Sequence, residues 1–104
     1  METQTATNRN LEIASTILHQ LGGRRFIAMT GASCYYDGAK AIFKFKGSRV
    51  ANCVSITLNV MDTYDVVFTK FRGIEVKTVR EINGVYAEDL ADTFESVTGL
   101  RTRL

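Results

Sequence analysis

Residues 53–72 read CVSITLNVMDTYDVVFTKFR, and apolar and polar residues alternate along them almost without a break. Because successive side chains of a strand point to opposite faces, this period places Val54, Ile56 and Leu58 together on one face. The alternation resumes at Tyr64, after a short polar break. Two such runs joined by a short break are typical of a β-hairpin. The segment therefore predicts an antiparallel sheet that is covered on one face only.

Further segments on both sides of this hairpin extend the predicted sheet. In one of them, Lys44 and Lys46 alternate with apolar residues. The last segment has the weakest alternation, which is typical of an edge strand. Between the first two, Gly31–Gly38 is predicted to be a connecting loop that carries both Tyr35 and Tyr36. The predicted strands are Arg25–Thr30, Ala41–Lys46, Asn52–Val60, Tyr64–Arg72 and Ile74–Ile82.

Helical patterns precede and follow the strands. Along residues 8–21, apolar residues recur at spacings of three and four, which places them on one face of a helix. Thr7 or Asn8 can cap this helix, and the glycine pair that follows it is a helix stop. After a predicted turn at Asn83-Gly84, a second helical pattern ends at Gly99. Its apolar stripe consists of Tyr86, Leu90, Phe94 and Val97.

The predicted fold is a single two-layer α+β domain, an antiparallel sheet of four or five strands with an N-terminal and a C-terminal helix packed on one face. The length of 104 residues and the hydrophobic fraction of 45% fit one domain with a modest core. Residues 1–7 are predicted to be a flexible N-terminus, and residues 8–104 the folded domain. No apolar run approaches the ~20 residues that span a membrane. The first residues also lack the features of a secretory signal, so we expect a cytoplasmic protein.

The sequence offers no set of residues that predicts catalysis or metal binding. Two cysteines and one histidine stand at spacings that match no zinc pattern. Cys34 has no predicted base beside it, because His19 lies on a different element. Asp62, Thr63 and Asp65 can offer oxygen ligands to a hard cation, although these residue types more often shape a hairpin turn. We therefore predict a protein that is not an enzyme and holds no cofactor or metal.

Charge is distributed unevenly along the chain. Residues 1–50 carry seven basic and three acidic residues, whereas residues 84–98 carry four acidic residues and no basic one. Pairing of the first two predicted strands would gather basic side chains beside Tyr35 and Tyr36. Basic groups among aromatic ones are typical of nucleic-acid surfaces, tyrosines also anchor protein interfaces, and a solvated sheet face is the alternative interpretation. The candidate partner-binding residues are Tyr35, Tyr36, Arg24, Arg25, Lys40, Lys44, Lys46 and Arg49.

Six short blocks of the sequence carry a resemblance to a group of proteins. They are LGG (residues 21–23), FIAMTGA (26–32), ITLN (56–59), DTYDV (62–66), GVYA (84–87) and TGL (98–100). In order and spacing, these blocks resemble a group of small uncharacterised proteins encoded by bacteriophages and prophages, from about residue 18 to the C-terminus. The resemblance implies a phage or mobile-element accessory protein in the cytoplasm of the bacterial host, and it implies no catalytic residue.

Two functions are expected as alternatives. The first is a non-enzymatic phage or mobile-element accessory protein that acts by binding a host or phage protein. The second is an accessory protein that binds nucleic acid, either single-stranded or duplex DNA, through a basic strand face and the loop with the two tyrosines. An exposed edge strand would also allow a homodimer.

Overall fold

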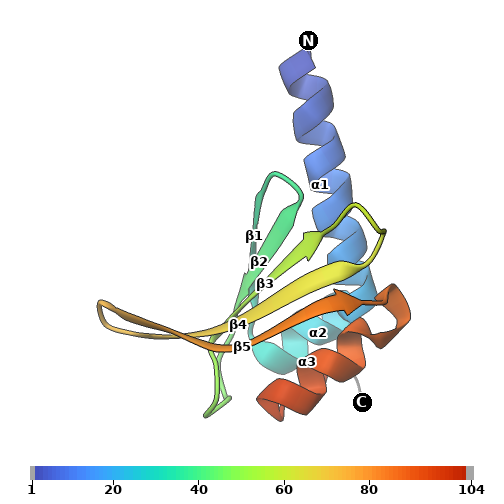
Figure 1. Cartoon of the computed structure of the whole chain (residues 1–104). Coiled ribbons are helices and arrows are strands. Elements are labelled where there is room, and N and C mark those ends of the chain that lie inside the picture. Colours follow the sequence, from blue (N-terminus) through green and yellow to red (C-terminus); the bar gives the residue numbers. More distant parts are fainter. Residues whose placement is uncertain (1, 103–104) are drawn as a thin grey trace.

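Five strands follow one another along the chain and pair in that same order, antiparallel at every step (Figure 1). The computed structural model describes residues 2–102, with side chains from residue 10 onward. Helices pack against one face of the sheet, so the predicted two-layer α+β fold is confirmed. The elements are α1 (Glu2–Leu21), α2 (Arg24–Thr30), β1 (Ser33–Asp37), β2 (Lys40–Lys44), β3 (Cys53–Leu58), β4 (Tyr64–Arg72), β5 (Glu75–Val85), the 3-10 helix η1 (Ala87–Asp89) and α3 (Leu90–Thr98).

The hairpin predicted from residues 53–72 is present as β3 and β4. Val54 lies opposite Phe68 and Ile56 opposite Val66, and all four side chains are buried beneath the helices. Strand β4 has the predicted bounds, whereas β3 is shorter than the predicted Asn52–Val60. The alternation predicted this hairpin correctly because one face of it is covered and the other is not.

Asn59 organises the turn between β3 and β4. Its Oδ1 accepts hydrogen bonds from the backbone N–H groups of Met61 (2.9 Å) and Thr63 (3.2 Å). Its Nδ2 donates to Thr63 Oγ1 at 2.8 Å and to Asp65 Oδ1 at 3.1 Å. Asp62 has a φ of 61°, a left-handed conformation that aspartate tolerates in turns. The side chains of Thr63 and Asp65 thus serve the turn.

Phenylalanine rings form the centre of the core. Phe26 on α2 meets Phe43 on β2 edge to face, with ring centroids 5.4 Å apart. Phe94 on α3 packs in the same way on Phe26 (5.1 Å) and on Phe45 (5.0 Å). The sheet, α2 and α3 are therefore joined through one aromatic cluster. Helix α1 adds the buried side chains of Ala14, Ile17 and Leu21.

The predicted strand at Arg25–Thr30 is wrong, because this segment is helix α2. Phe26 and Thr30 are its buried residues, four positions apart on one helix face, and Thr30 Oγ1 donates to the backbone oxygen of Phe26 at 2.7 Å. Arginine, alanine and methionine favour helices, and no polar residue alternates with the apolar ones. Gly31 ends the helix in the left-handed conformation, with a φ of 66°.

The predicted loop at Gly31–Gly38 is also wrong, because Ser33–Asp37 forms strand β1. Asp37 pairs with Lys40 across a two-residue turn that begins at Gly38, whose φ is 60°. Glycine at the first position of a two-residue loop favours a tight hairpin turn, and this signal outweighs the absence of alternation here. All five residues of β1 are exposed, so this edge strand lacks the buried face that would have revealed it in the sequence.

The turn predicted at Asn83-Gly84 is a β-bulge inside strand β5. Tyr64 pairs with Val85 and Val66 with Ile82, so two residues of β5 oppose only Asp65 of β4. Gly84 has a φ of 72°, and its N–H donates to Asp65 Oδ1 at 3.3 Å. Glycine in the left-handed conformation is the signature of this kind of bulge.

Both predicted helices are present, but each begins at a different residue than predicted. Helix α1 has the bounds Glu2–Leu21, which extend beyond the predicted residues 8–21. The predicted flexible N-terminus and the capping side chains of Thr7 and Asn8 lie outside the residues whose side chains are described. Helix α3 ends before Gly99, as predicted, with that glycine at a φ of 76°. Tyr86, predicted for the helical stripe, precedes η1 and is exposed.

The β4–β5 hairpin extends past the rest of the sheet as a two-stranded arm, which we define as residues 70–78 (Figure 1). Every residue from Phe71 to Thr78 is exposed. The turn at its tip is two residues long, and Gly73 adopts a φ of 63° there. The arm therefore offers both of its faces to a partner.

Candidate functional site

The sheet face that carries no helix holds several of the predicted binding residues. Because Phe43 and Val54 point into the core, the neighbouring positions of their strands point to the open face. This face carries Lys44 on β2, and Lys46 two residues further along the chain. On the arm, Phe71 pairs with Val76 on the same face. We define the open-face surface as Tyr35, Lys44, Lys46, Phe71 and Val76.

Tyr35 and Lys44 contact each other across the β1–β2 hairpin. The Nζ atom of Lys44 lies 5.5 Å from the centroid of the Tyr35 ring, which is the geometry of a cation–π interaction. Tyr35 is 52% exposed, so its ring remains accessible beside the ammonium group. This contact fixes the position of one cation at the centre of the open-face surface.

A cavity of about 420 Å³ lies between the end of β2 and the arm. Lys44 and Lys46 line it from one side, and Phe71 lines it from the other, with Phe71 41% exposed. Val76, opposite Phe71, is 60% exposed. The cavity thus combines two cationic side chains with an accessible aromatic ring.

Asn52 holds the arm in place at the rim of this cavity. Its Nδ2 donates to the backbone oxygen of Phe71 at 2.8 Å, and its Oδ1 accepts from the N–H of Phe71, also at 2.8 Å. The backbone N–H of Asn52 donates a hydrogen bond to the backbone oxygen of Thr69 at 3.1 Å. The amide side chain therefore continues the β3–β4 ladder by one step where the backbone of β3 has ended.

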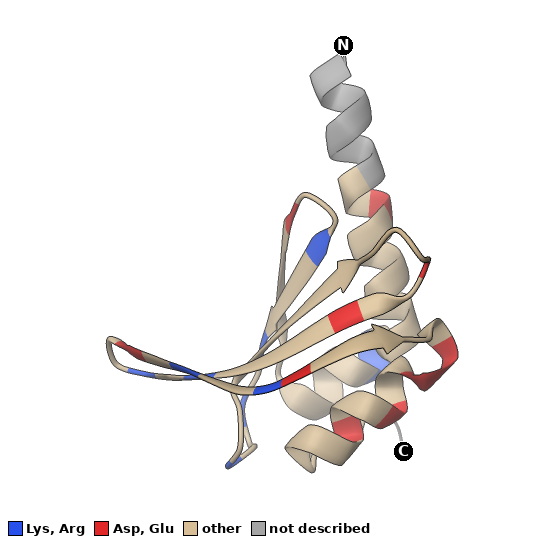
Figure 2. Ribbon diagram, viewed as in Figure 1, with Lys and Arg blue, Asp and Glu red and all other residues tan. Residues whose placement is uncertain are grey.

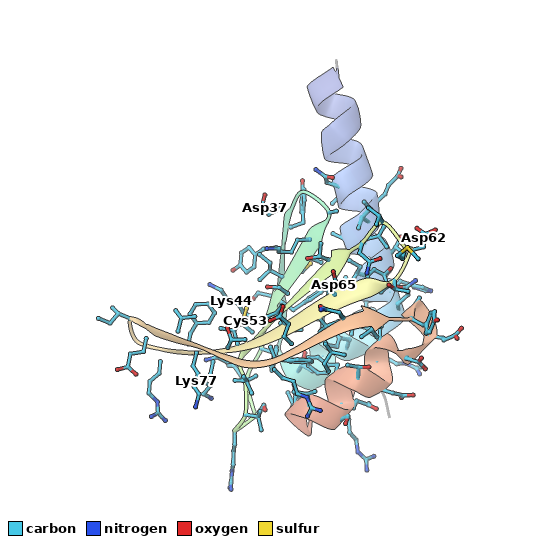
Figure 3. All side chains as sticks on the ribbon, in the orientation of Figure 1. Asp37, Lys44, Cys53, Asp62, Asp65 and Lys77 are labelled. Carbon is cyan, nitrogen blue, oxygen red and sulfur yellow. The ribbon has the colours of Figure 1, made fainter. Side chains whose placement is uncertain are left out.

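The two cysteines are free, and their surroundings do not activate them. Burial raises the pKa of the Cys34 thiol above its usual value of 9.0. Burial also raises the pKa of the Cys53 thiol, and the nearby Lys44 ammonium acts in the opposite direction. A raised pKa lowers the fraction of thiolate at neutral pH, which is the nucleophilic form. In Figure 3, Cys53 lies beside Lys44 at the base of the arm.

The structure separates the remaining predicted binding residues. Lys40 lies on the same open face as Lys44, but four residues away at the other end of β2. Tyr36 pairs with a buried residue of β2, so its ring turns toward the helix side. Arg24 and Arg25 begin helix α2, so they do not pair with Lys44 on a neighbouring strand. Arg49 lies in the β2–β3 loop and lines a different cavity.

Sequence reasoning missed the arm as a binding element. Its alternation of apolar and charged residues predicted an ordinary strand pair with a buried apolar face. Phe71 and Val76 are exposed because the helices do not reach this far along the sheet (Figure 1).

Comparisons of the chain with models of protein families, with curated proteins and with solved structures gave no match. Within residues 2–102, no helix combines the length and the hydropathy that a membrane crossing requires. The described residues also contain no group of three or more His, Cys, Asp or Glu side chains that could hold a metal ion.

Proposed function

We propose that this chain is a non-enzymatic accessory protein of a phage or mobile element, and that it binds a host or phage protein in the bacterial cytoplasm. The observation that carries this proposal is the open-face surface. Phe71 and Val76 are exposed there on the β4–β5 strand pair, and Lys44 and Lys46 line the cavity beside Phe71. Exposed aromatic side chains are enriched at the centres of protein interfaces.

The charges around these anchors define the chemistry of the partner. Lys44 and Lys46 flank the cavity that Phe71 lines, and the described lining contains no carboxylate. A partner segment with an apolar side chain and adjacent Asp or Glu residues would fill the cavity and neutralise both cations. Removing the apolar area from water would contribute about 25 cal/mol per Å². We therefore infer an acidic partner segment with an apolar anchor.

Nucleic acid is the less favoured occupant of this face. That interpretation required Arg24 and Arg25 to lie on a strand beside Lys44, and they lie on helix α2 instead. The open-face surface retains two lysines, and a neighbouring Lys40 lies opposite Asp37 in the β1–β2 pairing. So few cations would give weak, strongly salt-dependent binding to phosphates.

The test compares matched variants in a pull-down from bacterial lysate treated with nuclease. Phe71→Ser removes the aromatic anchor, and Tyr86→Ser removes an aromatic ring that is 61% exposed outside the open-face surface. A central anchor contributes at least about 2 kcal/mol, so Phe71→Ser is expected to weaken binding at least roughly 30-fold. Tyr86→Ser is expected to retain the partner.

A photo-crosslinking residue at position 71 gives the second measurement. The protein retained by the unaltered chain should be the one that crosslinks from position 71. Equal retention by Phe71→Ser, or crosslinking only to a second copy of this chain, would contradict the proposal. In the latter case, light scattering should show a dimer whose formation depends on Phe71.

A further inference from the structure

A second cavity, of about 380 Å³, lies between the arm and the β2–β3 loop. Four cationic side chains line it, and Glu75 is the one carboxylate in its described lining. We name this site the basic cavity and define it by Arg49, Lys70, Arg72 and Lys77. Figure 3 shows Lys77 on the other side of the arm from Lys44, so the basic cavity is separate from the open-face surface.

The alternation of the strands explains why these cations gather. Phe68 of β4 points beneath the helices, and Lys70 is the next residue on that same face. Lys77 of β5 pairs directly with Lys70. Arg49 approaches from the β2–β3 loop, which Ser48 anchors by donating a hydrogen bond from Oγ to the backbone oxygen of Thr98 at 2.8 Å. The arm and an anchored loop thus hold the cations in a fixed arrangement.

Two of the cations, Lys70 and Lys77, face each other directly, whereas Arg72 lies opposite Glu75. Directly opposite residues of an antiparallel pair have Cβ atoms about 5 Å apart, and like charges there are destabilising. Lys70 and Lys77 occupy such a pair, and Arg72 follows two residues later on the same face. A site that concentrates repelling cations is suited to a ligand with several negative charges.

We propose that the basic cavity binds the phosphodiester backbone of double-stranded DNA, with the arm lying in the major groove. A two-stranded β-ribbon fits the major groove of DNA, which is about 12 Å wide. The arm is such a ribbon, it projects from the body, and its cations are spaced about 7 Å apart along β4, two residues at a time (Figure 1). Arginine side chains bind phosphate with two parallel hydrogen bonds.

The distribution of charge over the molecule also favours an orientation in which the arm points toward the DNA. The acidic residues of η1 and α3, Glu88, Asp89, Asp92 and Glu95, lie toward the other end of the molecule from the tip of the arm (Figure 2). A DNA duplex that approaches the arm would therefore meet Lys70, Arg72, Lys77 and the single carboxylate Glu75, away from the acidic helix. An acidic protein would also be attracted, but a row of cations on a projecting ribbon matches a regular row of phosphates.

The test measures binding of the full chain to a labelled DNA duplex of about 20 base pairs by fluorescence anisotropy, at several salt concentrations. Four phosphate contacts predict a loss of affinity of roughly 150-fold between about 50 and about 200 mM salt. Lys70→Gln combined with Lys77→Gln removes two contacts, so the loss over the same range should fall to roughly 10-fold. Arg24→Gln combined with Arg25→Gln removes the same charge from α2 and should leave the salt dependence unchanged.

Three comparisons can overturn the proposal. Equal salt dependence in the unaltered chain and the Lys70/Lys77 variant would exclude the basic cavity. Equal binding of duplex RNA, whose major groove is too narrow and deep for a ribbon, would exclude the proposed geometry. Equal binding of labelled polyglutamate of matched charge would assign the cavity to an acidic protein. Thermal unfolding of the variants verifies that they are folded, and the pull-down with Phe71→Ser tests the open-face surface independently.

Discussion

Tyr64 begins strand β4 and is 4% exposed, beneath helix α1. Burial raises the pKa of its phenol above the usual value of 10.0, a hydrogen bond with Gln20 lowers it, and the nearby Asp62 carboxylate raises it. The unfolded chain therefore loses this proton at a lower pH than the folded chain does. The stability that neutral Tyr64 contributes is complete below the unfolded pKa and is lost as pH rises through the folded pKa.

We expect Tyr64→Phe to flatten the decline of stability at alkaline pH, because the side chain can no longer ionise in the unfolded state. The free energy of unfolding, measured by urea denaturation between about pH 9 and 11, should fall less steeply than in the unaltered chain. Tyr86→Phe, at an exposed position, is the control and should preserve the original slope. The same slope in both variants would contradict the assignment to Tyr64.

At the scale of elements, the side chain of Asn52 adds a link between the base of the arm and the segment before β3. Asn52 makes two hydrogen bonds to the backbone of Phe71, on the strand where the arm begins. Both bonds lie at the edge of the 420 Å³ cavity, so their loss would change the open-face surface as well as the hairpin. Asn52 is therefore a positioning residue for the proposed interface.

Asn52→Ala is expected to destabilise the protein by about 0.5–1.5 kcal/mol, because the exposed N–H and oxygen of Phe71 exchange their protein partner for water. The amide hydrogen of Phe71 should also exchange faster with solvent, which native-state hydrogen exchange measures directly. Asn83→Ala, at an exposed position of β5, is the matched control and should leave both quantities nearly unchanged. Unaltered exchange at Phe71 in Asn52→Ala would show that the bridge does not hold the arm.

The comparison between sequence and structure is most instructive at this scale. The strands in residues 53–72 could be predicted because one of their faces is buried. Burial of one face makes apolar and polar residues alternate along a strand. Strand β1 has no buried face, and α2 is a short helix with apolar residues on its exposed side, so neither carried a readable period. Tyr35, Lys44 and Lys46 could be predicted as binding residues from the sequence. Phe71 could not, because its exposure depends on how far the helices cover the sheet in the folded molecule.

At the scale of the whole molecule, the C-terminal segment ties the helices together. The backbone N–H and the Oγ1 of Thr102 both donate to Glu95 Oε2, at 2.8 and 2.9 Å, which links the segment to α3. The backbone oxygen of Thr102 lies against Gly22, between α1 and α2, where an added Cβ atom would come within 2.9 Å of it. Three helices are therefore joined at this point, and Thr102 is fully buried.

Gly22→Ala and Gly23→Ala make a matched pair that tests this junction. Both glycines have a positive φ, of 129° and 63°, so each substitution strains the backbone. At Gly23 no atom lies within 4 Å of an added Cβ, but its φ of 63° and ψ of −130° form a conformation that is open mainly to glycine, and such strain costs about 1–3 kcal/mol. Gly22→Ala also displaces the backbone of Thr102, so it should lower the free energy of unfolding more. Equal losses in urea denaturation would show that the junction carries no extra stability.

The two irregularities of β5 have a consequence for the behaviour of the protein at high concentration. An eleven-residue outer strand with a regular row of free backbone groups is a template on which further chains can add and grow into fibrils. Strand β5 is interrupted by the bulge at Asn83-Gly84 and by a second register shift at Val79. The row of free backbone groups on the outer edge of β5 is therefore continuous only over short stretches. The extra twist at each bulge rotates these stretches relative to one another. Deleting Val79 would restore a longer straight edge, so light scattering at high concentration should show larger assemblies for this variant than for the unaltered chain.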